Sequence, residues 1–174
     1  MCGIAGQFFA SGSVPALDSL RAMGDAMRYR GPDDEGFHRA PHIGLVHRRL
    51  SVRDLTPAGH CPMPSADGRI QVVFNGEIYN WRELRAELEA EGRPFASQSD
   101  TEVIVAGYES WGMDLIPRLR GMFSLAIWDA RETRLVLARD RLGEKPLFYF
   151  PHADGLTFAS TLGALTASGD LPKI

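Results

Sequence analysis

The residue best suited to chemistry in this sequence is Cys2, which directly follows Met1. Cysteine has a small side chain, so we expect Met1 to be removed, which would leave a thiol and a free α-amine on one residue. An α-amine has a pKa of roughly 7.7–8 and a thiol one of roughly 8.5, so both can change protonation near neutral pH. The amine can therefore act as general base for its own thiol, making Cys2 a candidate nucleophile. The alternative is an edge strand whose cysteine has no chemical role.

A second candidate is the pair Asn75 and Gly76, which follows an apolar run at residues 70–74. Asn75 carries an amide donor and Gly76 a sterically open backbone N–H, so the two donors could hold a developing oxyanion. An Asn-Gly pair is also a favoured tight turn. The residues by themselves predict such a turn between a strand and a capped helix.

Two charged residues complete the candidate set. The planar guanidinium group of Arg49 suits bidentate binding of a carboxylate, although a solvated surface arginine is the more common case. Asp100 lies in the first turn of a predicted helix, where the helix dipole stabilises a carboxylate. Asp100 could therefore cap that helix or receive an ammonium group. With the thiol and the oxyanion donors, these residues fit an α-amino acid that carries a side-chain carbonyl.

Many strands and about three helices are expected to position these residues. The strands are expected over residues 3–9, 43–50, 70–74, 122–128, 135–138, 147–150 and 156–159. Because strands follow one another rather than alternating strictly with helices, an α+β layering is favoured over a doubly wound parallel sheet. The nearly continuous apolar run at 122–128 predicts a strand covered on both faces.

Helix signals are clear at three places. Residues 15–27 have a helical apolar period, and Asn80 and Ser99 each stand three residues before a glutamate, as in a capping box. Residues 139–149 have a charged centre between apolar flanks, which predicts a strand, turn, strand hairpin. The tail at 161–174 begins like a helix and then stops, as expected for a fragment of a longer polypeptide.

Length and composition bound the possible functions. The 174 residues suffice for one domain with a sizeable core. The 19 basic and 22 acidic residues nearly balance, so charge gives no argument that the protein binds nucleic acid or a membrane surface. No apolar run approaches the roughly 18 residues that span a bilayer. Two cysteines, Cys2 and Cys61, do not make a disulfide framework, and no Cys/His cluster has zinc-like spacing. With no secretory pattern at the N-terminus, the cytoplasm is the expected compartment.

The chain also resembles a known family through motifs that occur in order. They lie at residues 1–6, 30–33, 47–51, 75–80, 99–102 and 139–149. This pattern is similar to the glutaminase domain of glutamine-hydrolysing asparagine synthetases, among the class II glutamine amidotransferases. The resemblance implies a four-layer αββα sandwich of the N-terminal nucleophile hydrolase type. It places a glutamine amidotransferase domain at 1–165 and, at 166–174, the start of a linker to a missing synthetase domain.

The resemblance implies a reaction for the candidate nucleophile. After loss of Met1, Cys2 would attack the side-chain amide of L-glutamine, and Asn75 with the Gly76 N–H would hold the tetrahedral oxyanion. Ammonia would leave, and water would hydrolyse the γ-glutamyl thioester to L-glutamate. Arg30 would order the mouth of the site.

The resemblance also implies how the substrate is bound. Arg49 would bind the α-carboxylate of glutamine, while Glu77 and Asp100 would receive its α-ammonium group. Leu50 and Val52 would contribute backbone contacts.

No metal or other cofactor is expected in this domain. ATP and magnesium are expected only in the missing ATP-pyrophosphatase-type synthetase domain, which would use the ammonia to make asparagine. Cys61, after Gly59 and His60, departs from the family pattern and is expected to be an incidental thiol. The alternatives are an inactive module that senses glutamine or docks a partner, an amidase for another amide, and an ammonia donor for a different carboxylate.

Overall fold

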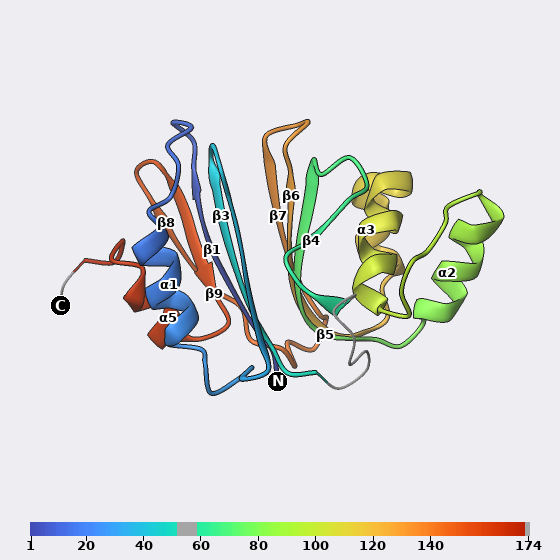
Figure 1. The fold of residues 1–174 in the computed structure, drawn as a ribbon, viewed down its shortest axis with the longest axis horizontal. Coiled ribbons are helices and arrows are strands. Elements are labelled where there is room, and N and C mark those ends of the chain that lie inside the picture. Colours follow the sequence, from blue (N-terminus) through green and yellow to red (C-terminus); the bar gives the residue numbers. More distant parts are fainter. Residues whose placement is uncertain (52–58, 173–174) are drawn as a thin grey trace.

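A computed structural model describes residues 1–51 and 59–172 and arranges them in four layers (Figure 1). Two antiparallel sheets face each other, and helices cover the outer face of each. One sheet has the strand order β2-β3-β1-β9-β8, and the other has the order β4-β5-β6-β7. The predicted α+β fold with its αββα layering is therefore confirmed.

The first sheet and its helices come from the two ends of the chain. Its strands are β1 (Gly3–Phe9), β2 (Asp34–Ala40), β3 (Ile43–Arg49), β8 (Phe148–His152) and β9 (Gly155–Ala159). Its covering helices are α1 (Leu17–Asp25) and α5 (Leu162–Ala167) (Figure 1).

The second sheet and its helices come from the middle of the chain. Its strands are β4 (Met63–Pro64), β5 (Ile70–Ile78), β6 (Gly121–Asp129) and β7 (Arg134–Arg139). Its helices are α2 (Trp81–Ala90) and α3 (Asp100–Trp111), followed by the short turns η2 (Gly112–Asp114) and α4 (Leu115–Arg118). Within the described ranges, none of the helices combines the length and apolar content needed to cross a membrane.

The sheets are joined by a fully buried apolar layer. Its members include Ile4, Ile43, Leu45, Val73, Ala126 and Phe158, all 0% exposed. Along β6 the side chains alternate between two cores: Ala126 and Trp128 face this inter-sheet layer, whereas Leu125 and Ile127 pack toward the helices. The continuous apolar run of β6 is thus covered on both faces, as predicted.

Strand β5 differs from the sequence prediction at its end. The predicted Asn-Gly turn is wrong, because β5 continues to Ile78 and pairs Asn75 with Ser124 and Gly76 with Phe123 on β6. A Cβ at residue 76 would lie 2.6 Å from the Cα of Phe123. Glycine here therefore permits close approach of two backbones within the sheet rather than a reversal of the chain.

The predicted hairpin at residues 139–149 is also wrong. Strand β7 belongs to one sheet and β8 to the other, so the segment between them crosses from sheet to sheet. The buried Asp140 carboxylate anchors this crossover by accepting four backbone N–H groups, those of Phe123, Leu142, Glu144 and Lys145. Burial by itself raises the pKa of Asp140, but these N–H donors, with that of Lys145 foremost, lower it overall.

The two predicted helix caps have different outcomes. Ser99 caps α3 as expected, because its Oγ accepts the Thr101 N–H at 3.2 Å. The Asn80 side chain does not cap α2. Instead its Nδ2 donates to the Arg118 carbonyl at 3.0 Å and its Oδ1 accepts the Arg120 N–H at 2.9 Å. Asn80 therefore ties the end of β5 to the segment that leads into β6.

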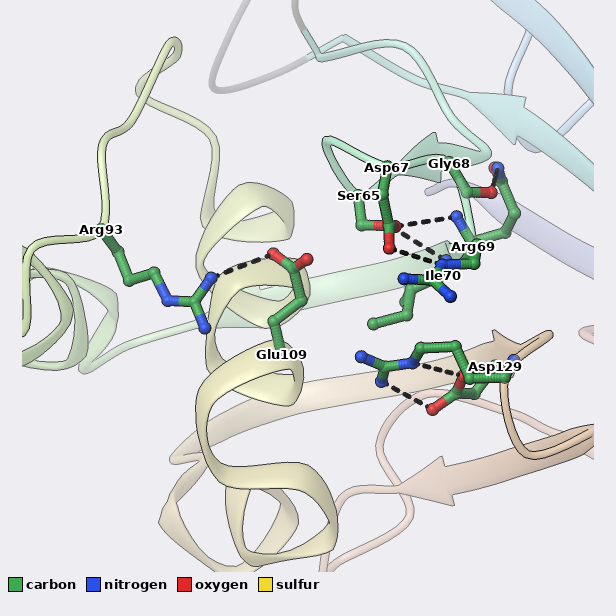
Figure 2. A network of polar contacts seen from close by, with 10 residues as sticks. Ser65, Asp67, Gly68, Arg69, Ile70, Arg93, Glu109 and Asp129 are labelled. Carbon is green, nitrogen blue, oxygen red and sulfur yellow. Dashed lines mark hydrogen bonds and ion pairs between the residues drawn. The ribbon is translucent and has the colours of Figure 1, made fainter.

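The other end of β5 is fixed by a polar turn (Figure 2). The Asp67 carboxylate accepts the Ser65 hydroxyl at 2.7 Å and both the backbone N–H and Nε–H of Arg69, at 3.0 and 2.7 Å. The Ile70 N–H donates to the same Ser65 Oγ at 3.0 Å. The Ser65 hydroxyl and the Arg69 N–H groups lower the pKa of Asp67. The strand is thus anchored before its first residue, far from Asn75.

Packing in the inter-sheet layer should contribute measurably to stability. Replacing Phe158, which is 0% exposed, by alanine leaves a cavity between the sheets and should lower the free energy of unfolding by about 3–5 kcal/mol. Urea denaturation followed by circular dichroism measures this loss. Leu142→Ala is the matched control, because Leu142 is 85% exposed and its truncation should change stability by less than about 0.5 kcal/mol. Equal losses in the two variants would contradict the assignment of the core.

Candidate functional site

A cavity of about 230 Å³ lies where β1 begins, β3 and β5 end, and α3 starts. It is lined by Met1, Cys2, His47, Arg49, Leu50, Gly59, Cys61, Phe74, Asn75, Gly76, Glu77, Ser99, Asp100, Thr101, Met122 and Lys145. Most of the residues singled out from the sequence are therefore in one place. Val52, the other predicted contact, lies outside the described residues.

Cys2 lies just before β1 and faces this cavity. Its Sγ accepts the Leu50 N–H at 3.4 Å and lies 3.7 Å from the Leu50 carbonyl oxygen, to which the thiol can donate. The β1–β3 pairing, with Gly3 opposite Arg48, brings these two residues together. The N–H and the carbonyl of Leu50 together fix the position of the sulfur at the cavity wall.

Met1 lines the cavity beside Cys2. Its ammonium group donates to the Arg30 carbonyl at 3.2 Å, and its Sδ lies 3.6 Å from the Lys145 Nζ. Arg30 also donates from Nε to the Cys2 carbonyl at 3.0 Å. While Met1 is attached, the α-nitrogen of Cys2 belongs to a peptide bond and cannot act as a base. Removal of Met1 would free that nitrogen beside the sulfur.

The candidate oxyanion donors come from the opposite sheet. Asn75 is 1% exposed, and its Nδ2 donates to Ser124 Oγ at 3.4 Å from the neighbouring position on β6. An amide NH2 group has two N–H bonds, so this contact orients the amide and leaves a second N–H for a ligand. Gly76 follows at the partly exposed cavity wall. Ser124 was not recognised from the sequence, because only the β5–β6 register places it beside Asn75.

Two oppositely charged groups are buried in the cavity walls. Arg49 at the end of β3 is 8% exposed, so it is not the solvated surface residue that is the commoner case. Asp100 at the start of α3 is 6% exposed, and its Oδ2 accepts the Ile78 N–H at 3.0 Å. The cap of α3 is Ser99 rather than Asp100. One cation and one anion on different walls suit the two charged ends of an α-amino acid.

His47 is a cavity residue to which sequence reasoning assigned no role. It is 3% exposed, and its Nε2 lies 3.0 Å from the Phe74 carbonyl oxygen. Burial lowers the pKa of His47 to about 4. The available signal was its position two residues before Arg49, which puts both side chains on one face of a strand.

Cys61 also lines the cavity, but its surroundings differ from those of Cys2. It is 2% exposed, with its Sγ 3.9 Å from the Gly59 carbonyl oxygen. Burial raises the pKa of the Cys61 thiol to about 12. The thiol expected to be incidental is therefore part of the cavity wall and is protonated at neutral pH. Among the described residues, no group of His, Cys, Asp or Glu side chains could hold a metal ion.

Comparison with known proteins defines the class. The family model of the glutamine amidotransferase domain matches residues 1–173, and the chain belongs to this family. The fold is shared with glutamine phosphoribosylpyrophosphate amidotransferase from B. subtilis, at a TM-score of 0.77 and 19% identity over 97% of this chain and 44% of that one. The predicted sandwich of the N-terminal nucleophile hydrolase type is thereby confirmed.

Among curated proteins, the chain is similar to parts of longer ones. Asparagine synthetase (glutamine-hydrolysing) 2 of Bacillus subtilis is 42% identical, with 99% of this chain and 23% of that protein covered. A putative glutamine-hydrolysing asparagine synthetase of Mycobacterium tuberculosis is 41% identical, with 92% and 27% covered. Amidase chry2 of Gibberella zeae is 37% identical, with 90% and 24% covered. The chain thus spans about a quarter of the length of these relatives.

The two cysteines should differ sharply in reactivity. Iodoacetamide at pH 8 should alkylate Cys2 in the folded protein and leave Cys61 unmodified, because burial raises the pKa of Cys61 to about 12 and blocks access to it. Peptide mass mapping gives the site of modification. The Cys2→Ala variant should take up no label when folded and one label in urea. Comparable native labelling of both cysteines would contradict the assignment.

Proposed function

We propose that this chain is a glutaminase that hydrolyses L-glutamine to L-glutamate and ammonia. The observation that carries the proposal is the convergence of Cys2, Asn75, Arg49 and Asp100 on one cavity. Family membership supports it, since glutamine is the substrate that the family's description names.

The proposed reaction starts once Met1 has been removed. The α-amine of Cys2 takes the thiol proton, and the thiolate attacks the side-chain carbonyl carbon of glutamine. The Asn75 amide and the Gly76 N–H stabilise the negative oxygen of the tetrahedral intermediate. The α-ammonium then gives its proton to the departing nitrogen, the C–N bond breaks and ammonia leaves.

The second half of the reaction regenerates the thiol. Water attacks the γ-glutamyl thioester of Cys2 while the α-amine takes a proton from it, and the same oxyanion donors act again. The C–S bond breaks, the sulfur regains a proton and glutamate departs. The Leu50 N–H, 3.4 Å from Sγ, steadies the sulfur whenever it carries charge.

Substrate recognition is assigned to groups on the cavity walls. Arg49 binds the α-carboxylate through charge-assisted hydrogen bonds, and Asp100 with Glu77 receives the α-ammonium group. Leu50 adds a backbone contact, and the contact expected of Val52 stays a prediction from the sequence. Arg30, which donates a hydrogen bond to the Cys2 carbonyl, orders the entrance of the cavity.

The ammonia is proposed to serve asparagine synthesis in a longer protein, as the names of the 41–42% identical relatives suggest. A synthetase domain of the ATP-pyrophosphatase type would use ATP and magnesium, whereas this domain needs neither for its reaction. The division into residues 1–165 and 166–174 and the cytoplasmic location stay predictions. An amidase that acts on another amide is the second candidate, since a relative named an amidase is 37% identical.

The nucleophile is tested by Cys2→Ala. This variant should lower glutamine turnover at least about a thousand-fold while keeping the wild-type unfolding temperature, because only the reacting atom is lost. Release of glutamate and ammonia is measured, with intact mass reporting whether Met1 has been removed. Residual turnover near wild type would rule out the thioester. Glutamine binding without turnover in a chain that retains Met1 would instead support the inactive sensing module.

The role of Arg49 is tested through its neighbour Gly59. A Cβ at residue 59 would lie 2.8 Å from the Arg49 Cζ and overlap a guanidinium nitrogen, so Gly59→Ala must displace the guanidinium group. Loss of a charge-assisted contact should raise KM for glutamine about ten-fold or more with little change in kcat.

Gly163→Ala is the matched control, because a Cβ there meets nothing within 4 Å. Its KM should equal that of the wild type. An unchanged KM in Gly59→Ala would show that Arg49 does not hold the substrate.

A further inference from the structure

The proposed reaction needs groups from two different sheets, and one buried side chain joins them at the site. We propose that His47 is a positioning residue that ties the nucleophile's sheet to the strand bearing the oxyanion donors. The inference rests on the proposed glutaminase function and adds a residue to it.

On the first sheet, His47 is directly linked to the nucleophile's strand. It stands on β3 opposite Ile4 of β1, and Ile4 is only two residues from Cys2. Paired strands move together, because their backbones share a hydrogen-bonded ladder. A force on His47 is therefore transmitted to the backbone that carries the sulfur.

On the second sheet, His47 contacts the residue immediately before Asn75. Its Nε2 lies 3.0 Å from the Phe74 carbonyl oxygen. Among the described residues, β4 pairs with β5 only at Gln71 and Val72, so beyond Val72 that edge of β5 has no neighbouring strand. The imidazole supplies a hydrogen-bond donor where a strand would otherwise supply one.

The chemistry of the contact fixes the tautomer of His47. A carbonyl oxygen only accepts, so Nε2 carries the proton and Nδ1 keeps its lone pair. Nδ1 is buried and has no hydrogen-bond partner among the described residues. Burial opposes a second proton and outweighs the Phe74 contact and Asp34, which favour it, while His60 and Arg49 add smaller opposition; the pKa of His47 falls to about 4. The imidazole is thus neutral at working pH and donates one constant hydrogen bond.

The consequence of losing this tie follows from the geometry of the reaction. The sulfur and the oxyanion donors must be placed to within a fraction of an ångström, and a displacement of about 1 Å can cost about 100-fold in rate. Arg49, assigned to the substrate carboxylate, stands two residues further along β3 but is held by its own pairing with Asp34 on β2, and Asp100 lies on α3. Loosening His47 should therefore affect kcat more than KM.

The experiment compares His47→Leu, which removes the donor, with His47→Gln, whose amide can still donate to the Phe74 carbonyl. Both are made in the full-length protein with Met1 removed. His42→Ala is the control, because the His42 Nδ1 makes the same kind of contact, 2.9 Å to the Phe9 carbonyl oxygen, at the far end of β3. The readouts are kcat and KM for glutamine, the kcat–pH profile, iodoacetamide labelling of Cys2, and backbone amide exchange over residues 72–78.

His47→Leu should lower kcat about 10–100-fold with KM within about three-fold, while labelling of Cys2 stays within about three-fold, because alkylation needs no oxyanion donor. Exchange over residues 72–78 should become faster. His47→Gln should recover most of the loss with an unchanged pH profile. His42→Ala should lower thermal stability and leave kcat at the wild-type value.

Three results would overturn the proposal. The first is an unchanged kcat in folded His47→Leu, and the second is an equal loss of kcat in His42→Ala. The third is the disappearance of one arm of the kcat–pH profile in His47→Gln, which would assign proton transfer to the imidazole. If wild-type protein does not hydrolyse glutamine, the proposed function fails by itself. Amide exchange then still tests whether His47 holds β5: faster exchange over residues 72–78 in His47→Leu supports this role, and unchanged exchange refutes it.

Discussion

The packing of two sheets against each other is the interaction on which the rest of this structure depends. The candidate nucleophile directly precedes β1 of one sheet and the candidate oxyanion donors lie on β5 of the other, so the apolar layer between the sheets determines how they are placed relative to each other. Side chains such as Ile4, Val73 and Phe158 fill that layer and are fully buried. Protein interiors are close-packed and transmit strain rather than absorbing it. The relative placement of the candidate groups therefore depends on this core and, in the role proposed for it, on the contact of His47 with Phe74.

The cavity also keeps ionic groups away from water, which is costly unless each is held by partners. Asp100 is stabilised at the start of α3 by the helix dipole and by the Ile78 N–H. Arg49 lies against Gly59, where a side chain would collide with the guanidinium group. Such fixed, poorly solvated charges bind an oppositely charged ligand group strongly because little reorganisation is needed. The proposed substrate, a zwitterionic amino acid, carries a group of opposite charge for each of them.

The sequence predicts those parts of the molecule that local rules determine. The apolar run of β6, the Ser99 cap and the layering follow from periodicity, side-chain chemistry and resemblance, and Cys2 and Arg49 are recognisable by residue type and spacing. The rest depends on partners distant in sequence. Asn75 continues a strand because β6 pairs beside it, and residues 139–149 cross between sheets because Asp140 collects N–H groups from around it. Local turn propensity favoured a different outcome at both places.

Two thiols in one cavity show how far environment, rather than residue type, decides reactivity. Cys61 is enclosed by the wall, and burial holds its proton in place. Cys2 instead receives a backbone N–H and lies at the chain terminus, where loss of one residue creates a base within reach of the sulfur. With Met1 attached, that base is absent, and Met1 lines the cavity in contact with Arg30 and Lys145. The fold thus brings the candidate nucleophile, oxyanion donors and charged residues to one cavity, and removal of Met1 would supply the amine.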